Sequence, residues 1–296
     1  MNVKQMIEFG ASRLAAAPLC YGHGSDNALD EAAELVLFAT GLKHEDAPGV
    51  YALQLTLEQQ AAALALISQR IERRIPAAYL THRMWFAGHE FYVDNRVLVP
   101  RSPIAELIQM HYAPWIDAGT VQRVLDIGAG SGCIAIATAL ALPKTTVDAA
   151  DVSDDALAVA RINIEKHALK KRVRAVKSDV FDGLGAARYD LIVSNPPYVS
   201  LSEAAGLPDE YRHEPHIGLL AGDDGLSVVR RILAGAEQRL TPHGLLVVEV
   251  GDTEEMLVKA YPRAPFTWLE FEHGGGGVFV LTAAQLAEHR KEFRLS

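Results

Sequence analysis

VLDIGAGSG, at residues 124–132, is an apolar run that passes directly into a glycine-rich turn. The apolar residues predict a buried β-strand, and the residues from Cys133 onward fit a helix. Glycine lets a backbone turn sharply and approach a ligand closely, and a helix N-terminus offers free N–H groups. We therefore predict a strand–turn–helix unit with a ligand at its turn; an ordinary tight turn is the alternative.

Strands and helices alternate along the chain on both sides of this unit. Strands are expected at Arg123–Ile127, Thr145–Asp151, Val173–Lys177, Tyr189–Ser194, Gly244–Val250, Thr267–Phe271 and Val278–Thr282. Helices are expected at Ile104–Tyr112, Cys133–Leu142, Asp154–His167, Leu226–Leu240 and Thr253–Tyr261. The alternation predicts an α/β fold with a seven-stranded, mostly parallel sheet covered on both faces. The short Gly274–Gly277 link predicts an antiparallel C-terminal hairpin at the sheet edge.

The N-terminal part of the chain follows a different pattern. Amphipathic stretches predict helices at Val3–Ala17, Asn27–Thr40 and Leu57–Arg74, so residues 1–80 should form a small helical domain. This domain would serve partner recognition or simply packing. Residues 81–102 contain an alternating stretch that predicts a β-hairpin linker, with Asp94-Asn95 as its turn. The remaining residues, 103–296, would form the α/β domain.

Composition limits the classes of function and partner. The formal net charge of −9 argues against a large DNA-binding surface, which needs clustered Lys and Arg. It suits a basic partner, although acidic enzymes are common. The two cysteines, Cys20 and Cys133, are far apart and indicate a reducing compartment, without a disulfide framework. With no signal peptide and no apolar run of membrane-spanning length, we expect a cytoplasmic protein that does not enter a membrane.

The glycine spacing distinguishes between two kinds of nucleotide-binding turn. A dinucleotide fold would place a third glycine at position 133, where this chain has a cysteine. Asp151 ends the next strand, where a carboxylate can accept both hydroxyls of an adenosine ribose; its alternative role as a helix N-cap suits Ser153 better. Asp179 follows the third strand and could accept an adenine amino group. The predicted cofactor-binding residues are Asp126, Gly128, Ala129, Gly130, Ser131, Gly132, Asp151, Asp179 and Asn195.

Asn195-Pro196-Pro197-Tyr198 follows the apolar strand DLIVS and carries the strongest chemical signal. A planar amide or aromatic amino nitrogen is a poor nucleophile because its lone pair is delocalised. The Asn195 side-chain oxygen and the Pro196 carbonyl could each accept one N–H, aiming the π lone pair at a donor methyl group. The prolines stiffen this loop, and Tyr198 offers a flat face for stacking. We predict Asn195, Pro196 and Tyr198 as catalytic residues, with Pro197 also contacting the substrate; a rigid turn is the alternative.

A cluster of acidic and histidine side chains at residues 210–216 could suggest a metal site. Pro215 interrupts the helical spacing that would bring His213 and His216 to one face, and the region is expected to be a loop. We therefore expect no metal. His82 and His89, which flank the hairpin, are expected to be surface or packing residues.

The motifs resemble those of the HemK-type class I methyltransferases, which modify the amide nitrogen of protein glutamines. The resemblance covers nearly the whole chain and rests on DIGAGSG at 126–132, Asp151 and NPPY at 195–198. It implies that the glycine turn and Asp151 bind S-adenosylmethionine and that NPPY holds the glutamine amide. Members that modify release factors have P-R-P-E-T-E after the hairpin, whereas this chain has PRSPIAE at 100–106. That segment, with WFAGHEFYVD, EYRHEP and GGGGVFVLT, resembles the PrmB branch, which acts on ribosomal protein L-three.

Other classes of function remain open alternatives. Release-factor methylation would use the same chemistry, and a DNA adenine methyltransferase would share the NPPY logic, but the net charge opposes DNA. A nicotinamide-dependent oxidoreductase is opposed by Cys133 and by NPPY. A non-catalytic adenosyl-binding module would leave NPPY unexplained. The expected partner is therefore ribosomal protein L-three, free or assembling, with no DNA.

Overall fold

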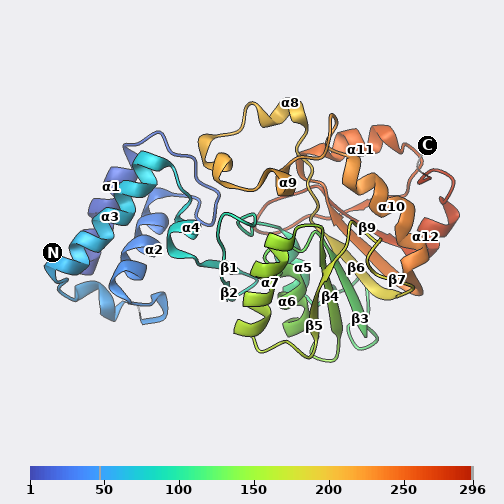
Figure 1. Cartoon of the computed structure of the whole chain (residues 1–296), viewed down its shortest axis with the longest axis horizontal. Coiled ribbons are helices and arrows are strands. Elements are labelled where there is room, and N and C mark those ends of the chain that lie inside the picture. Colours follow the sequence, from blue (N-terminus) through green and yellow to red (C-terminus); the bar gives the residue numbers. More distant parts are fainter. Residues whose placement is uncertain (47, 295–296) are drawn as a thin grey trace.

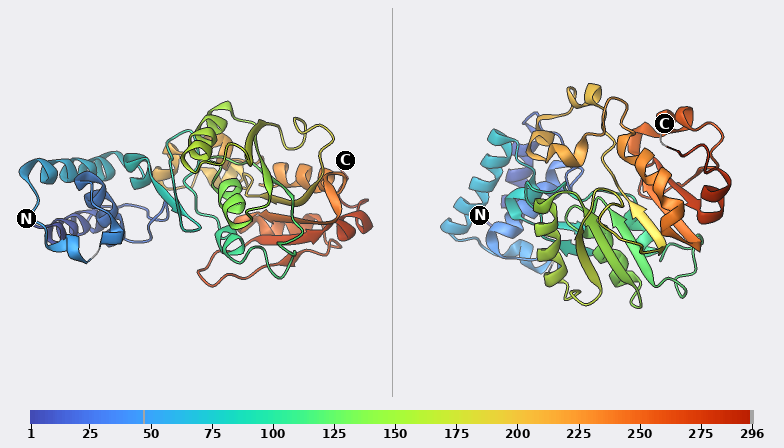
Figure 2. Two further views of the ribbon diagram at one scale, coloured as in Figure 1. Left: turned by 90° about the horizontal axis from the view of Figure 1, so that it is seen from below. Right: turned by 45° about the vertical axis from the view of Figure 1, so that its right-hand side comes forward.

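A computed structural model describes residues 1–46 and 48–294 of the chain as a helical domain beside a larger α/β domain (Figure 1). The helical domain lies at one end of an elongated molecule (Figure 2, left). Among the described residues, no helix combines the length and the apolar character that crossing a membrane requires.

The N-terminal domain consists of α1 (Val3–Ala15), α2 (Ala28–Thr40), α3 (Leu57–Arg73) and α4 (Ala77–Thr81), with 3₁₀ turns at His44–Asp46 and Gly49–Ala52. Asn2, Asn27 and Thr56 cap the first three helices, because each side-chain oxygen accepts a backbone N–H that the first turn leaves unpaired. Their apolar faces form a separate buried core, which includes Met6, Leu35 and Ile67. The predicted helical domain is present, with α4 in addition.

A two-stranded hairpin, β1 (Met84–Phe86) and β2 (His89–Phe91), leads from this domain toward the sheet. Its turn is at Ala87 and Gly88, whose φ angles of 48° and 82° suit a tight hairpin turn. The hairpin turn is therefore not at Asp94-Asn95, although a separate turn begins there, in which the N–H of Val97 donates to the carbonyl of Asp94 at 3.1 Å. Asp94 instead binds the side chain and backbone N–H of Arg96, which shapes the segment after the hairpin. Asn and Asp are common in turns of any kind, so their presence alone did not locate this one.

The α/β domain follows the expected alternation closely. Its first half is α5 (Ile104–Gln109), β3 (Arg123–Ile127), α6 (Cys133–Ala141), β4 (Thr146–Asp151), α7 (Asp154–Lys166), β5 (Val173–Lys177) and β6 (Tyr189–Ser194). Its second half is α8 (Leu201–Ala204), α9 (His216–Leu219), α10 (Ser227–Arg239), β7 (Leu240–Glu249), α11 (Glu254–Ala260), β8 (Thr267–Trp268), β9 (Val278–Thr282) and α12 (Ala283–Glu288). Two 3₁₀ turns, Asp209–His213 and Gly251–Thr253, complete it.

The sheet has seven strands in the order β5-β4-β3-β6-β7-β9-β8. The first five in this order are parallel, whereas β9 pairs antiparallel with both β7 and β8. The predicted α/β class and antiparallel edge hairpin are confirmed. The second half differs in detail: β7 begins at Leu240, β8 has only two residues, and α12 was not predicted.

Helices cover both faces of the sheet because successive strand residues point to opposite sides. On one face Val124 packs with residues of α5 and α6, and on the other Leu125 packs with residues of α10 and α12. The parallel strands all end at the same edge, so Ile127, Asp151 and Ser194 lie close to one another there. The strand order changes direction between β3 and β6, and ligands of such sheets bind at this crevice.

The segment between β6 and α10 lies above this edge and extends toward the helical domain (Figure 1). Glu210, which is fully buried in it, binds Arg70 at 3.0 Å and Arg74 at 2.7 Å from α3 and its C-terminus. Arg70 also pairs with Glu31 of α2. Hydrogen bonds from Cys20 and these arginines hold the pKa of Glu210 below its ordinary value, although burial opposes this. We call Glu210, Arg70, Arg74 and Glu31 the interdomain clasp.

Candidate active site

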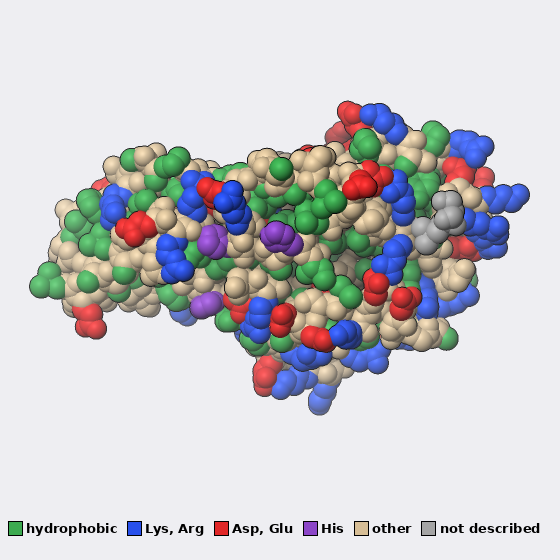
Figure 3. Space-filling model, turned by 45° about the horizontal axis from the view of Figure 1, so that its top comes forward, with side chains coloured by type: hydrophobic (Ala, Val, Ile, Leu, Met, Phe, Trp, Pro, Cys, Tyr) green, Lys and Arg blue, Asp and Glu red, His purple; other side chains and the backbone are tan. Residues whose placement is uncertain are grey.

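A cavity of about 440 Å³ opens at the carboxyl edge of the sheet. Figure 3 brings the top of the molecule forward and shows hydrophobic side chains along its middle, with charged side chains on both sides. One side of the cavity is formed by the glycine turn and the ends of β4 and β5, and the other by residues 96–102 and 207–220. The predicted residues that line it are Gly128, Ala129, Gly130, Ser131, Asp151, Asp179, Asn195, Pro196, Pro197 and Tyr198.

The glycine turn keeps side chains away from the cavity. Gly128 and Gly130 have φ angles of 72° and 53°, in the left-handed region that favours glycine. A Cβ atom on Gly130 would find no atom within 4 Å, so the space beside this turn is open to a ligand. A Cβ atom on Gly128 would lie 3.8 Å from the carbonyl oxygen of Asn195, so the turn lies against the NPPY loop.

Asp151 orders this turn from the end of β4. One carboxylate oxygen accepts the N–H of Gly130 at 2.9 Å, and the other accepts the N–H of Ser153 at 2.8 Å. Burial raises the pKa of this carboxyl, and the backbone hydrogen bonds oppose that shift. Each oxygen keeps acceptor capacity for a hydroxyl group in the cavity. Ser153 caps α7, as expected, which leaves Asp151 available for a ligand.

Two of the predicted cofactor residues lie behind the cavity wall. Asp126 is fully buried, and one of its oxygens accepts the N–H of Ala135 in α6 at 3.0 Å. Gly132 begins α6 in a left-handed conformation, where a Cβ atom would lie 3.3 Å from Ala160. Neither residue lines the cavity, and cofactor binding by Asp126 and Gly132 stays a prediction. Both shape the turn: Asp126 binds the first turn of α6 through the Ala135 N–H, and Gly132 lets the start of α6 pack closely against Ala160.

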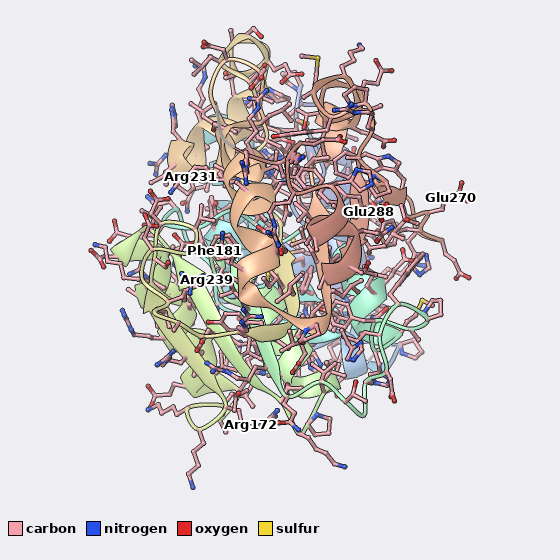
Figure 4. All side chains as sticks on the ribbon, turned by 90° about the vertical axis from the view of Figure 1, so that its right-hand side faces the viewer. Arg172, Phe181, Arg231, Arg239, Glu270 and Glu288 are labelled. Carbon is pink, nitrogen blue, oxygen red and sulfur yellow. The ribbon has the colours of Figure 1, made fainter. Side chains whose placement is uncertain are left out.

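Asp179 lines the cavity and is also ion-paired. Its carboxylate accepts a hydrogen bond from Arg231 of α10 at 2.7 Å, and about half of its side chain is exposed. Figure 4 labels Arg231 on this helix, above Phe181 and Arg239. Because a carboxylate accepts several hydrogen bonds, this pair leaves room for an amino group of a ligand.

The NPPY loop begins where β6 leaves the sheet. The hydroxyl of Ser194 donates to the carbonyl of Ile127 at 2.7 Å, which joins the ends of β6 and β3 just before the loop. The ring of Tyr198 packs against Gly251, where a Cβ atom would come within 2.6 Å of the ring. Its hydroxyl donates to Glu249 at 3.3 Å. The loop is thus supported on two sides, by the glycine turn and by the end of β7.

Two further residues of this site, Glu249 and Ser102, were not predicted from the sequence. Glu249 ends β7 and is 4% exposed, and it accepts a hydrogen bond from the hydroxyl of Ser102 at 2.5 Å. Burial raises the pKa of Glu249 to about 7. The available signal was a single carboxylate at the end of the apolar run LLVVEV, since a buried acid at a strand end is uncommon outside a functional site.

The acidic and histidine cluster at residues 210–216 serves a structural purpose. Glu210 belongs to the interdomain clasp, and Glu214 accepts two hydrogen bonds from Arg101, at 2.6 and 2.7 Å. Although burial opposes it, Arg101 together with His23 holds the pKa of Glu214 at about 2. The described residues contain no group of three or more His, Cys, Asp and Glu side chains that could hold a metal ion.

The glycine-turn side of the cavity fits an adenosine-bearing sulfonium cofactor. It offers an open turn with exposed backbone and a buried carboxylate, Asp151, where ribose hydroxyls would bind. The NPPY loop adjoins it, and all four of its residues, Asn195, Pro196, Pro197 and Tyr198, line the same cavity. On the opposite side from the glycine turn, which we call the acceptor side, the lining residues include Val99, Tyr211 and Ile217.

Named proteins are similar in sequence to this chain over nearly its whole length. Residues 112–206 match the family model of the methyltransferase small domain. A protein of Xanthomonas campestris, named ribosomal protein uL3 glutamine methyltransferase, is 48% identical over 97% of this chain and 93% of its own length. A Francisella tularensis protein of the same name is 43% identical over 99% of this chain and 94% of its own. A methyltransferase structure from Pyrococcus furiosus covers 65% of this chain and 88% of its own, with 21% identity and a TM-score of 0.47.

Proposed function

Because this chain belongs to the family of ribosomal protein uL3 glutamine methyltransferases, we propose that its substrate is uL3, the large-subunit ribosomal protein L-three. The chain is a methyltransferase, and its cofactor is S-adenosylmethionine. The methylated atom is the side-chain amide nitrogen of a glutamine. The observation that carries this proposal is the NPPY loop, held against the glycine turn at the edge of the cavity.

The cofactor would be held by the residues on the glycine-turn side. Backbone groups of Gly128, Gly130 and Ser131 would face it, Asp151 would accept its ribose hydroxyls, and Asp179 would accept its adenine amino group. S-adenosylmethionine supplies an electrophilic methyl group on a sulfonium centre.

The protein must raise the reactivity of a weak nucleophile. The side-chain oxygen of Asn195 and the backbone carbonyl of Pro196 would each accept one N–H of the glutamine amide. This pair of acceptors turns the π lone pair of the nitrogen toward the glycine-turn side and stabilises the positive charge that develops on nitrogen. Stiff prolines and the support from Gly128 hold the acceptors in place before substrate binds. Tyr198 would form one wall for the planar amide.

Each part of the chain would have a separate role. Residues 1–80 would help to recognise the substrate protein, residues 81–102 would link the domains, and residues 103–296 would carry the cofactor and the chemistry. The interdomain clasp supports this division, because it joins the segment on the acceptor side of the cavity to the helical domain, and Arg101 joins the linker to the same segment through Glu214. The cavity is recessed, so the glutamine must lie on a segment that can leave its own fold. We expect free or assembling uL3 in the cytoplasm to be the substrate, with no DNA or membrane partner.

A competition experiment tests the proposal. The purified enzyme receives labelled S-adenosylmethionine with equimolar free uL3, peptide release factor and double-stranded DNA. Label should appear on uL3, at a glutamine identified by mass spectrometry, and it should be much weaker on mature ribosomes. Label mainly on the release factor would assign the chain to the sister activity, and label on adenine would overturn the proposal.

Asn195→Ala supplies the matched control for this experiment. Turnover should fall by roughly two to three orders of magnitude, the scale for removing one preorganised transition-state hydrogen bond. Cofactor affinity by calorimetry should change much less, because the Asn195 side chain is assigned mainly to the acceptor amide. A variant with normal turnover would remove Asn195 from the mechanism.

A further inference from the structure

Glu249 and Asn195 lie beside each other where two neighbouring strands end. Strands β6 and β7 are parallel, and their register pairs Ser194 with Val248. The next residue along each strand is Asn195 and Glu249 respectively. Because neighbouring strands are about 4.8 Å apart, the two side chains leave the sheet within reach of each other. Hydrogen bonding from the Asn195 side chain is also one of the effects that lower the pKa of Glu249.

The Glu249 carboxylate accepts hydrogen bonds from two different segments that line the cavity. Ser102 donates to one of its oxygens at 2.5 Å, from the segment that follows the hairpin. Tyr198 donates to the other oxygen at 3.3 Å, from the NPPY loop. The carboxylate is 4% exposed, so these partners replace water around it. Burying a carboxylate costs free energy. Neither the binding of the amide by Asn195 and Pro196 nor the methyl transfer gives Glu249 a direct role.

We infer that Glu249 is a positioning residue that accepts a hydrogen bond from the Asn195 Nδ2 atom and so turns Oδ1 toward the glutamine amide. The inference rests on the proposed function and adds to it the group that sets the orientation of Asn195. An Asn side chain has a donor end and an acceptor end of nearly the same shape. Only the orientation with Oδ1 toward the substrate accepts a substrate N–H. A carboxylate behind Nδ2 selects that orientation, because it accepts hydrogen bonds and donates none.

The charge state of Glu249 then controls the site. Burial raises its pKa to about 7, against the lowering effect of Ser102, Tyr198, Asn195 and the positive charge of Arg101. Above this pH the carboxylate accepts from all its donors. Below it, the protonated acid can donate to Asn195 and favour the opposite orientation. Turnover should therefore be lost as pH falls through about 7. The groups that face Glu249 and carry charge or titrate are Arg101 and Tyr198.

Glu249→Gln is the direct test, measured with the full chain, S-adenosylmethionine and free uL3. The change keeps the shape of the side chain but removes the pure acceptor. The turnover number should fall about 10- to 100-fold, the scale for removing a group that orients a catalytic one. The KM for uL3 and the affinity for the cofactor should change less than about threefold. The fall in turnover below pH 7 should disappear.

A double variant distinguishes a positioning role, in which Glu249 acts through Asn195, from an effect of Glu249 that does not depend on Asn195. In the Asn195→Ala background, Glu249→Gln should cause little additional loss, because the group through which Glu249 acts is absent. Losses that multiply would overturn the inference. A direct view comes from the Nδ2 amide proton signals of Asn195 in the ligand-free protein. They should shift with pH near 7 in the original protein and stay constant in Glu249→Gln.

Ser102→Ala keeps the inference testable if Glu249→Gln does not fold. The Ser102 hydrogen bond lowers the pKa of Glu249, so its removal should move the acidic limb of the turnover profile to higher pH. A limb that stays in place in Ser102→Ala, or Glu249→Gln with normal turnover, would contradict the positioning role. The proposed function fails in a different way: the unaltered chain would then leave uL3 unmethylated.

Discussion

At the scale of single residues, Gly251 keeps the NPPY tyrosine in place. A Cβ atom on Gly251 would lie 2.6 Å from the Tyr198 ring, and the backbone there has a φ of 48°. Alanine would have to displace the ring or the end of β7, a clash that typically costs about 1–3 kcal/mol of stability. The displaced ring would also disturb the Glu249 contact.

We expect Gly251→Ala to lower both the unfolding temperature and the turnover number. Gly274→Ala is the matched control, because Gly274 has a φ of 82° but no atom within 4 Å of its Cβ position. The control shares the backbone strain and lacks the clash, so it should keep normal turnover. Thermal unfolding and initial rates measure the two effects, and equal turnover in both variants would contradict the tyrosine contact.

Asp151 is the residue that most directly tests the cofactor side of the cavity. Asp151→Ala should weaken the binding of S-adenosylmethionine by about 1.5–3 kcal/mol, the scale for losing charged hydrogen bonds. Part of this loss would come from the glycine turn, because Asp151 also accepts the N–H of Gly130. Calorimetry with Asp154→Ala is the control: that exposed residue is near in sequence and pairs with Lys177 at the surface. Equal affinity of Asp151→Ala and the original chain would exclude Asp151 from the site.

At the scale of elements, Asp126 couples the end of β3 to the start of α6. Burial raises the pKa of this carboxyl to about 7, and the Ala135 N–H lowers it only partly. The folded chain therefore keeps a proton that the unfolded chain releases near pH 4. The stability from this group is present in full below that pH and is lost as pH rises through about 7.

Asp126→Asn should remove this pH dependence while it keeps an acceptor for Ala135. Between pH 4 and pH 9 the unfolding free energy of the variant should rise relative to that of the original chain by roughly 2–4 kcal/mol. Denaturant unfolding at several pH values measures the difference. Parallel pH curves for the two proteins would show that Asp126 is not titrating in the folded state over this range.

The segment between β6 and α10 depends on the interdomain clasp. Glu210→Ala would leave Arg70 buried with only part of its charge compensated, and breaking such a pair costs about 3–5 kcal/mol. We expect the helical domain to loosen from the α/β domain, with faster proteolysis near residues 199–225. The kcat/KM for uL3 should fall, while cofactor affinity changes little.

Asp209→Ala is the matched control for the clasp. Asp209 is the neighbouring carboxylate, half exposed, and its pairs with Arg74 and Arg212 lie at the surface. Surface pairs contribute about 0–1 kcal/mol, so this variant should resemble the original chain. If Glu210→Ala also behaves like the original chain toward uL3, the clasp has no part in substrate use.

At the scale of the whole molecule, charge should govern how fast the substrate is met. The net charge of −9 attracts a basic ribosomal protein, and dissolved ions screen this attraction. The kcat/KM for free uL3 should therefore fall several-fold between about 20 and 300 mM salt, mainly through the association rate. A short uncharged glutamine peptide should show no such dependence in the same assay. Equal salt dependence for both substrates would exclude long-range attraction.

The sequence alone determined the architecture and predicted the core of the candidate site. The strand–turn–helix unit at 124–132, Asp151 at the end of β4 and NPPY at the end of β6 are local patterns, visible within one strand and the turn after it. The parallel sheet brings the carboxyl ends of its strands to one edge, so residues that are far apart in the sequence lie together there. Turn residues are less specific, which is why the hairpin turn was placed wrongly at Asp94-Asn95.

Only the tertiary structure decided which residues support that core. Glu249 is 54 residues beyond Asn195, and it adjoins Asn195 only because β7 pairs with β6 in the observed register. Glu210 binds Arg70, which is 140 residues earlier in the chain. A residue of the acidic and histidine cluster at 210–216 therefore links the two domains. Side-chain contacts between distant segments depend on strand order, register and domain packing. No local pattern of apolar and polar residues contains that information, because many packings satisfy the same pattern.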